Sequence, residues 1–324
     1  MEQKNINNYQ ICYYDNNWQK PVITEQCVFQ LFTEQNSLPF NYFAFPWASY
    51  IDNKWKYDQT LNIVIDNHIK SNNSVKSIEY IKYFTVVQHI NFIELLPIFK
   101  KLNIKYVFTP HKENTFKHHN LEKEYDLKLI PFSLFPKQNN ENNNIIPIEQ
   151  RKYLTSFIGQ YDPNCYMSDI RVKIFEQLSN YSDCYIISRN TWHYESVVYQ
   201  NKNTDKNNEL EYKFLLANSC FSLCPSGSGP NSLRIWESLS FGSIPVILTD
   251  TLEFPEIKNK NWNDYFIFWP ENNFHNLYTF MQKMDKNKLK QMSMNCINLY
   301  NEYFSPDTMN KTIIEYFEKN KIDN

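Results

Sequence analysis

With 324 residues, the chain is about twice as long as a typical single domain, so we expect two domains of roughly 150 residues each. Its 33 basic and 35 acidic side chains leave a formal net charge of −2, which excludes binding to nucleic acid or to an anionic membrane by charge alone. The polar residues 1–8 and the broken apolar runs, all shorter than about 18 residues, predict neither a signal peptide nor a membrane-spanning segment, and therefore a cytoplasmic protein.

The seven cysteines are scattered along the chain without any Cys-x-x-Cys pair. Three of them lie in apolar runs that are typical of buried strands, so we expect reduced thiols in the core and neither disulfides nor a cysteine-bound metal. Reduced thiols are the usual state in a reducing compartment, which agrees with a cytoplasmic location.

Glycine and arginine are rare in a chain dominated by Asn, Lys, Ile, Tyr and Phe. At the usual ~7% the chain would hold about 23 glycines, and it holds four. A retained glycine indicates a backbone that tolerates no side chain, and a retained arginine indicates a need for its planar fork. All of these residues lie between positions 151 and 242: Gly159, Gly227, Gly229, Gly242, Arg151, Arg171, Arg189 and Arg234.

In the first half, short β-branched or aromatic runs alternate with helical segments, as in a parallel sheet with crossover helices. Residues 1–60 show no clear period, so we predict irregular structure there. A helix is expected over Asn91–Leu102, kinked or shortened by Pro97. Strands are predicted at Leu61–Ile65, Tyr83–Ile90, Lys105–Thr109 and around Leu127–Pro131.

The polar run Lys137–Asn144 has no apolar anchor, so we predict an exposed connection between two domains, residues 1–145 and 146–324. The helices at the end of the second domain would be able to pack back on the first. An Asn-rich surface loop inside one domain is the alternative interpretation. A second polar run, Gln200–Leu210, is predicted to be a loop within the second half.

The same alternation resumes after the boundary. Strands are predicted at Tyr153–Ile158, Cys184–Ile187, Cys220–Cys224, Ile244–Leu248 and Tyr265–Trp269. Helices are predicted at Ser168–Ser179 with Ser168 as the cap, near Glu211–Asn218, at Ser232–Ser240 and from His275 onward. The predicted fold class is therefore α/β, with two Rossmann-like, doubly wound sheets facing one another and a ligand in the crevice at the C-terminal ends of the strands.

A loop rich in Gly, Ser and Pro leads from the strand ending at Cys224 into the helix that begins near Ser232. Its backbone N–H groups and the positive end of the helix would suit a phosphate. Arg234 lies in the first turn and Glu237 three residues further on, so a guanidinium for a pyrophosphate and a carboxylate for ribose hydroxyls would share one helix face. An ordinary i,i+3 surface pair beside an ordinary turn is the alternative, and the glycine spacing matches neither a P-loop nor GxGxxG.

This stretch resembles the nucleotide-sugar-binding core of the exostosin-like glycosyltransferases. The matching segments are Cys224-Pro225-Ser226-Gly227, Ser232-Leu233-Arg234-Ile235-Trp236-Glu237 and Gly242-Ser243-Ile244-Pro245-Val246-Ile247. Upstream, Tyr153–Gly159 and Ser168–Arg171 are similar to the family's phenylalanine- and glycine-bearing strand and to the arginine of its next helix. The segment Tyr212–Ser219 resembles the helix that precedes the Cys-Pro strand.

The resemblance implies a GT-B architecture, a UDP-sugar or similar donor held mainly by the C-terminal domain, and transfer with inversion. It places Arg234 and Arg171 near the phosphates and Glu237 near the ribose. The expected donor site also includes Ser232, Asn231, Gly227, Gly229, Arg189 and Gly159. Many members have arginine where this chain has Ser226, so we expect different donor contacts there, and we expect neither the membrane anchor nor the second, Asp-x-Asp-bearing domain of the animal members. We therefore expect no metal and no other cofactor.

Inverting transfer needs a base to take the proton of the acceptor hydroxyl, and we expect it in the N-terminal domain. Three candidates follow predicted strands, namely His111, His89 and Asp66 with the nearby His68. A neutral histidine is suited to this role because its pKa lies near 6.5. His111 ranks first because Pro110 ends its strand abruptly and should leave the side chain at the edge of the cleft. For each candidate, the alternative is a side chain that is satisfied in a loop or in the core.

The sequence thus predicts an inverting glycosyltransferase that moves a sugar from a nucleotide-sugar to a glycan or glycoconjugate acceptor. Two alternatives stay open. The first is a nucleotide-sugar epimerase or hydrolase of the same fold, which would form product without an acceptor. A nucleotide- or glycan-binding module without a base would bind the nucleotide without turnover. No nucleic-acid partner is expected.

Overall fold

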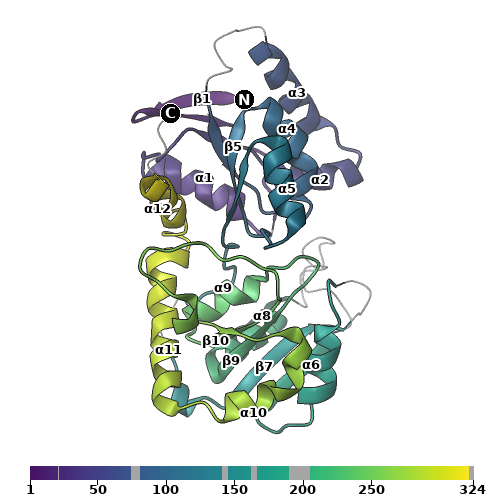
Figure 1. The fold of residues 1–324 in the computed structure, drawn as a ribbon, viewed down its shortest axis with the longest axis vertical. Helices are drawn as coiled ribbons and strands as arrows, with labels where there is room; N and C mark the ends of the chain where they lie inside the picture. The colour runs from purple at the N-terminus through teal and green to yellow at the C-terminus, as the bar shows by residue number, and fades with distance from the viewer. Residues whose placement is uncertain (21, 74–80, 141–144, 162–165, 190–204, 321–324) are drawn as a thin grey trace. The chain divides into compact units, whose positions relative to one another are not determined.

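A computed structural model describes residues 1–20, 22–73, 81–140, 145–161, 166–189 and 205–320. The chain divides into two compact units, each with its own sheet (Figure 1). Unit 1 consists of Met1–Phe135, Leu252–Lys258 and Met309–Asn324, and unit 2 of Pro136–Thr251 and Asn259–Thr308. Within the described part of the chain, no helix is both long and apolar enough to cross a membrane.

Unit 1 contains a six-stranded sheet in which the strands follow one another in chain order, β1-β2-β3-β4-β5-β6. Only β1 and β2 pair antiparallel. The strands are β1 (Glu2–Ile6), β2 (Tyr9–Tyr13), β3 (Tyr42–Ala44), β4 (Tyr83–Val86), β5 (Ile104–Thr109) and β6 (Lys128–Pro131). The helices are α1 (Thr24–Glu34), α2 (Trp47–Trp55), α3 (Thr60–Asn73), α4 (Leu96–Lys101), α5 (Phe116–Tyr125) and α12 (Lys311–Asn320).

Two apolar clusters, one on each face, bury the sheet of unit 1. Side chains alternate between the two faces along a strand, so Tyr42 lies in the cluster that includes α1 and α12, while Phe43 lies in the cluster that includes α2, α3 and α4. Phe317 of α12 stacks on Phe40 with ring centroids 4.9 Å apart. Helix α12 therefore contributes to the core of unit 1.

Two predictions in unit 1 are wrong. The expected strand Leu61–Ile65 is part of α3, where Leu61 and Ile65 are buried at i,i+4 spacing while Ile63 is 57% exposed. Residues 1–60 are not irregular, because β1, β2, α1, β3 and α2 all lie there, and strands of three to five residues are too short to show a period.

Three strand predictions in unit 1 are confirmed, as β4, β5 and β6, with β4 ending at Val86. Pro97 acts as expected on the predicted helix Asn91–Leu102. A 3₁₀ turn, Phe92–Leu95, precedes α4, and the proline occupies the first turn of α4, where its missing N–H costs no hydrogen bond.

Unit 2 contains a fully parallel five-stranded sheet in the order β11-β10-β9-β7-β8. The strands are β7 (Tyr153–Gln160), β8 (Cys184–Arg189), β9 (Ser219–Pro225), β10 (Ile244–Leu248) and β11 (Ile267–Phe268). The helices are α6 (Ile170–Leu178), α8 (Asp205–Asn218), α9 (Leu233–Ser240), α10 (Leu277–Gln282) and α11 (Lys286–Leu299), which a π-helical turn, Tyr300–Phe304, extends. The two sheets confirm the predicted α/β class with two Rossmann-like units.

The order of strands in unit 2 reverses at β7. From β7 the chain passes to β8 on one side and then returns to β9 on the other side. Such a reversal leaves a crevice between the carboxyl ends of the two central strands, and ligands of open α/β sheets bind in this crevice. In unit 2 the reversal lies between β7 and β9.

Three local predictions in unit 2 are corrected. Asp169, not Ser168, is the N-cap of α6, although the Ser168 hydroxyl still accepts the N–H of Ile170 at 3.4 Å. Gln138 in the expected exposed run is 1% exposed, and its backbone N–H donates to the buried carboxylate of Glu237, while residues 141–144 of this run lie outside the described part of the chain. The second polar run is helical in α8 from Asp205 onward, and residues 200–204 lie outside the described part of the chain.

Gly242 and Arg151 fix the turn between α9 and β10. Gly242 has a φ of +61°, the left-handed conformation that ends many helices. Arg151 donates to the carbonyls of Ser219 (2.8 Å), Phe241 (2.7 Å) and Gly242 (3.0 Å). Burial lowers the pKa of Arg151 to about 10. Arg151 therefore holds backbone carbonyls together and has a structural role.

Replacing Gly242 by alanine is expected to lower the free energy of unfolding by about 2 to 4 kcal/mol, since left-handed backbone and overpacking both carry a cost. The new Cβ would lie 2.8 Å from the Ser293 Oγ and 2.9 Å from the Ile297 Cδ1. Urea unfolding followed by tryptophan fluorescence measures the loss. Gly227→Ala is the matched control, because its nearest contact would be an ordinary 3.6 Å. Equal stability of the two variants would contradict this account of the turn.

Candidate functional site

Arg234 lies at the carboxyl ends of β7 and β9, where the strand order reverses. It occupies the first turn of α9 and is partly buried. Its Nη1 donates to the Leu223 carbonyl of β9 at 3.0 Å and its Nη2 to the Ile158 carbonyl of β7 at 2.5 Å. The guanidinium carbon lies 4.4 Å from the centre of the Phe157 ring. Arg234 thus joins the two central strands and places a positive charge at the crevice.

The side chain of Arg171, in the first turn of α6, also lies at the ends of β7 and β9. Its Nε donates to the Ser226 carbonyl, just after β9, at 3.1 Å. Its guanidinium lies 3.9 Å from the centre of the Tyr166 ring and 5.6 Å from that of Phe157. Neither Nη atom donates a hydrogen bond to any residue that the structure describes. Burial lowers the pKa of Arg171 to about 10, and the charge of Arg234 acts in the same direction against the opposing effect of Tyr166.

Gly159 leaves room for the Phe157 and Arg171 side chains, and Gly227 lies beside Arg171. A Cβ on Gly159 would lie 2.7 Å from the Phe157 ring and 3.2 Å from the Arg171 Nη1. A Cβ on Gly227 would lie 3.6 Å from the Arg171 Nη2. The Gly227 N–H donates to the carbonyl of Gly229 at 2.9 Å, so this loop amide already has a backbone partner. We name Phe157, Gly159, Arg171, Gly227 and Arg234 the Arg171–Arg234 cluster.

Three other donor-site candidates lie in different surroundings. Arg189, at the end of β8, forms an ion pair with Glu211, which neutralises its charge. The buried Asn231 accepts a hydrogen bond from the Trp236 indole N–H at 2.9 Å. Ser232 is the N-cap of α9 but makes no side-chain capping bond. The structure therefore brings Arg171, Arg234, Gly159 and Gly227 together, and it holds Arg189 in an ion pair of its own.

Glu237 is 3% exposed and has two partners within unit 2. Its Oε1 accepts the N–H of Gln138 at 3.0 Å, and its Oε2 accepts the Tyr212 hydroxyl at 2.8 Å. Burial raises the pKa of Glu237, while the bonds from Tyr212 and Gln138 and the charge of Arg234 oppose this rise. The interpretation of Arg234 and Glu237 as an exposed surface pair is wrong, because the carboxylate is buried and the two form no ion pair.

Taken together, the cluster holds two guanidinium groups against one aromatic ring. Among the residues that the structure describes, no carboxylate forms an ion pair with Arg171 or Arg234. Their mutual repulsion is relieved when an anion binds between or beside them, and two parallel donors on an arginine fit a phosphate. The position at the strand reversal is where this class of sheet binds nucleotides.

His111 follows β5 in unit 1 and is buried, with 6% of its surface exposed. Its Nε2 lies 3.1 Å from the Gln88 carbonyl, an acceptor, so this nitrogen carries the proton in the neutral ring. Its buried Nδ1 has no partner among the described residues. Burial lowers the pKa of His111 to about 4. The ring is therefore neutral near pH 7 and holds one unused lone pair.

The other base candidates differ from His111. His89 has both nitrogens engaged, with Nε2 at 3.2 Å from the Asp52 Oδ1 and Nδ1 accepting the Asn91 N–H at 3.0 Å. Asp66 is exposed within α3, so its expected position after a strand is wrong. His68, also in α3, lies 3.7 Å from the Cys12 Sγ, and burial lowers its pKa.

Glu25 is a buried carboxylate that the sequence analysis did not single out. It is linked to His111 through hydrogen bonds to Gln88. It is 2% exposed in the first turn of α1 and accepts the N–H groups of Gln88 at 3.0 Å and Ala48 at 3.2 Å. Burial raises its pKa to about 8. Gln88 joins the two groups, since its carbonyl accepts from His111. The sequence offers no signal for it, because Glu25 stands between the polar Thr24 and Gln26.

In the described ranges, no three His, Cys, Asp or Glu side chains gather in a way that would hold a metal ion. The structure defines the class as a parallel α/β unit with two arginines at its strand reversal, joined in one chain to a second α/β unit. The exostosin GT47 domain model matches residues 85–284, more than half of the chain. The chain therefore belongs to the exostosin-like glycosyltransferase family.

Several proteins are similar to this chain. An exostosin-1 homolog of Caenorhabditis elegans is 27% identical over 177 residues, which cover 53% of this chain and 46% of that protein. The ribitol-5-phosphate xylosyltransferase 1 of Mus musculus is 30% identical over 99 residues, which cover 31% of this chain and 20% of that protein. The chain therefore spans less than half the length of these relatives. A solved glycosyltransferase structure from Rickettsia africae has 10% identity and a TM-score of 0.47, covering 97% of this chain and 98% of that one.

Proposed function

We propose that this protein is a glycosyltransferase whose nucleotide-sugar donor places its diphosphate at the Arg171–Arg234 cluster. The observation that carries the proposal is that two arginines share one aromatic ring, without a carboxylate ion partner among the described residues, at the strand reversal of a parallel sheet. A departing nucleoside diphosphate develops negative charge, and preorganised cations stabilise it in the transition state. Membership of the exostosin-like family supports this assignment.

The finer assignment is UDP as the nucleotide, a glycan or glycoconjugate as the acceptor, and inversion at the transferred carbon. The unused Nδ1 lone pair of His111 is suited to accept the proton of the acceptor hydroxyl, provided that the acceptor reaches this buried nitrogen. The ribose would lie toward Glu237, provided that the carboxylate exchanges a present partner for a ribose hydroxyl. No disulfide joins any of the six described cysteines to another of them, which supports a reducing compartment as the working location.

Isothermal titration with UDP, GDP and CMP tests the donor assignment, and we expect UDP to bind most tightly. Donor consumption is then measured with and without sugar acceptors. Consumption that depends on an acceptor supports the transferase. Consumption without an acceptor would instead favour an epimerase or hydrolase, and binding without any turnover would favour a binding module.

Chelation is expected to leave the transfer rate within about twofold of the starting value, because two arginines supply the charge that a metal would otherwise provide. The measurement compares the rate in EDTA with that in added Mn²⁺, at saturating donor. A loss of turnover in EDTA that Mn²⁺ restores would contradict the metal-independent assignment.

A further inference from the structure

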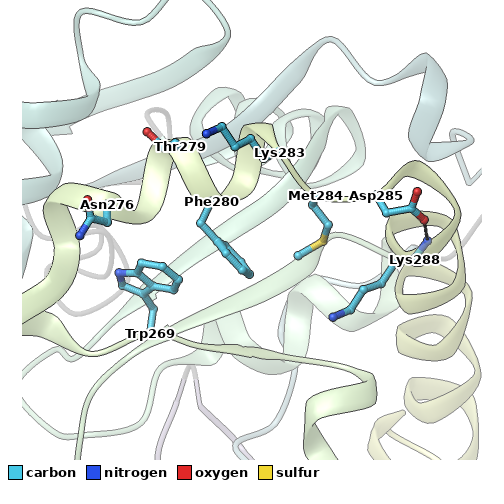
Figure 2. A pocket seen from close by; sticks show the side chains of 8 residues that line it. All are labelled: Trp269, Asn276, Thr279, Phe280, Lys283, Met284, Asp285 and Lys288. Atoms are coloured by element: carbon cyan, nitrogen blue, oxygen red, sulfur yellow. Dashed lines mark hydrogen bonds between the residues drawn. The ribbon is translucent and has the colours of Figure 1, made fainter.

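Unit 2 has a cavity of about 430 Å³ that the proposed donor site does not use. It lies between the end of β11, helix α10 and the start of α11 (Figure 2). Its lining includes Trp269, Asn276, Phe280, Lys283, Met284 and Lys288. No member of the Arg171–Arg234 cluster lines it, so a ligand here would be additional to the nucleotide. Its volume lies within the range of small-molecule sites, roughly 300 to 1,000 Å³.

Two aromatic side chains form an accessible apolar wall of this cavity. The rings of Trp269 and Phe280 lie next to each other, with centroids 4.8 Å apart and planes at 41° (Figure 2). The indole N–H of Trp269 donates to the Asn273 carbonyl at 3.0 Å, which fixes the ring and satisfies its polar edge. Phe280 is 36% exposed. A fixed aromatic face binds a ligand with little loss of conformational entropy.

The rim of the cavity carries positive charge. In the part of the chain that the structure describes, Lys283 and Lys288 form neither an ion pair nor a hydrogen bond through their amines. The carboxylate of Asp285 is already engaged, because its Oδ1 caps α11 by accepting the N–H groups of Asn287 at 3.0 Å and Lys288 at 2.9 Å. The rim therefore offers two ammonium groups to a negatively charged ligand.

We propose that this cavity binds a sugar ring bearing a carboxylate, within a glycan chain. The axial C–H groups of a pyranose have a slight positive charge and pack on an aromatic face such as that of Trp269. The carboxylate would pair with Lys283 or Lys288, and the amide of Asn276 would meet ring hydroxyls. A neutral lipid would leave both lysines unused. Nucleic acid is disfavoured, because two lysines on a chain of net charge −2 give little attraction for a phosphate backbone.

Calorimetric titration of the full chain with tetragalacturonate, and with its methyl ester as the uncharged counterpart, tests the proposal. We expect the acid to bind and the ester to bind more weakly. Lys288→Gln should weaken binding of the acid by about two- to fivefold, as for a solvent-exposed ion pair. Trp269→Ala should weaken it about tenfold through loss of the aromatic face. Each variant should retain the UDP affinity of the unmodified chain, which separates this site from the proposed donor site.

Lys290→Gln is the matched control, since Lys290 is exposed on the same helix, 61% by its side chain, and does not line the cavity. If Trp269→Ala does not fold, Phe280→Ala takes its place, because Phe280 is already partly exposed. The proposal is overturned if the acid does not bind, if the ester binds equally well, or if Lys290→Gln weakens binding as much as Lys288→Gln. Tighter binding of a single-stranded oligonucleotide would also overturn it.

Discussion

Replacement of Arg171 by alanine is expected to weaken UDP binding by about 10- to 100-fold, the usual contribution of charge-assisted hydrogen bonds of 1.5 to 3 kcal/mol. Arg171 uses only its Nε within the described structure, so both Nη atoms remain for a phosphate. Arg234, by contrast, already donates through both Nη atoms to the carbonyls of Leu223 and Ile158. We therefore expect Arg234→Ala to reduce stability as well as affinity. Isothermal titration and thermal unfolding of each variant measure the two effects.

Arg189→Ala is the matched control for this prediction. The arginine lies at the end of the neighbouring strand β8, and its charge is neutralised by Glu211, so UDP affinity should change little. Arg171→Lys retains the charge without the fork and should recover only part of the affinity. If Arg171→Ala folds and binds UDP as tightly as the unmodified chain, the diphosphate does not lie at the cluster.

His111→Ala is expected to lower kcat by a factor on the order of 10² to 10⁴, the usual contribution of a positioned base. The dissociation constant for UDP should remain near its starting value, because His111 belongs to unit 1 and the Arg171–Arg234 cluster to unit 2. Steady-state kinetics and calorimetry on the same preparation give both numbers. Loss of UDP binding would place His111 in the donor site instead. Full activity would transfer the role of base to His89 or Asp66.

The low pKa of His111 also sets a pH dependence. Burial lowers the pKa to about 4 in the folded chain, below the ordinary value near 6.5, so the unfolded chain binds this proton more readily between these two values. The contribution of neutral His111 to stability is complete above about pH 6.5 and is lost as the pH falls toward 4. The acid limb of kcat/KM that belongs to His111 should accordingly lie near pH 4, and a limb near pH 6.5 would indicate another base.

The rare glycines and arginines drew attention to one region of unit 2 because they lie close together in the sequence, but the contacts of each arginine could not be predicted from the sequence. Of the four arginines, Arg151 holds carbonyls, Arg189 pairs with Glu211, Arg234 joins two strands, and only Arg171 keeps both Nη atoms unbonded within the described structure. These roles depend on which strand ends meet, and the strand order β9-β7-β8 is a long-range property that no local pattern encodes.

Unit 1 was harder to predict for a different reason. A short apolar run such as Leu61–Ile65 fits a buried strand as well as one face of a helix, and only the exposure of Ile63 decides between them. Glu25 escaped notice because its importance comes from burial beneath Ala48 and Gln88, which are distant in the sequence. A polar residue that is selected by its tertiary surroundings leaves little signal along the chain.

Unit 1 is built from three separate stretches of chain, and this affects the order in which the two units can fold during translation. A ribosome releases the chain from the N-terminus, so residues 136–251 and 259–308 of unit 2 emerge before helix α12, whose Phe317 packs in the core of unit 1. Unit 2 can therefore complete its core during translation, while unit 1 has to wait for the arrival of α12. Until α12 emerges, Phe40 lacks its stacked partner, and the face of the sheet that α12 covers stays open in nascent unit 1.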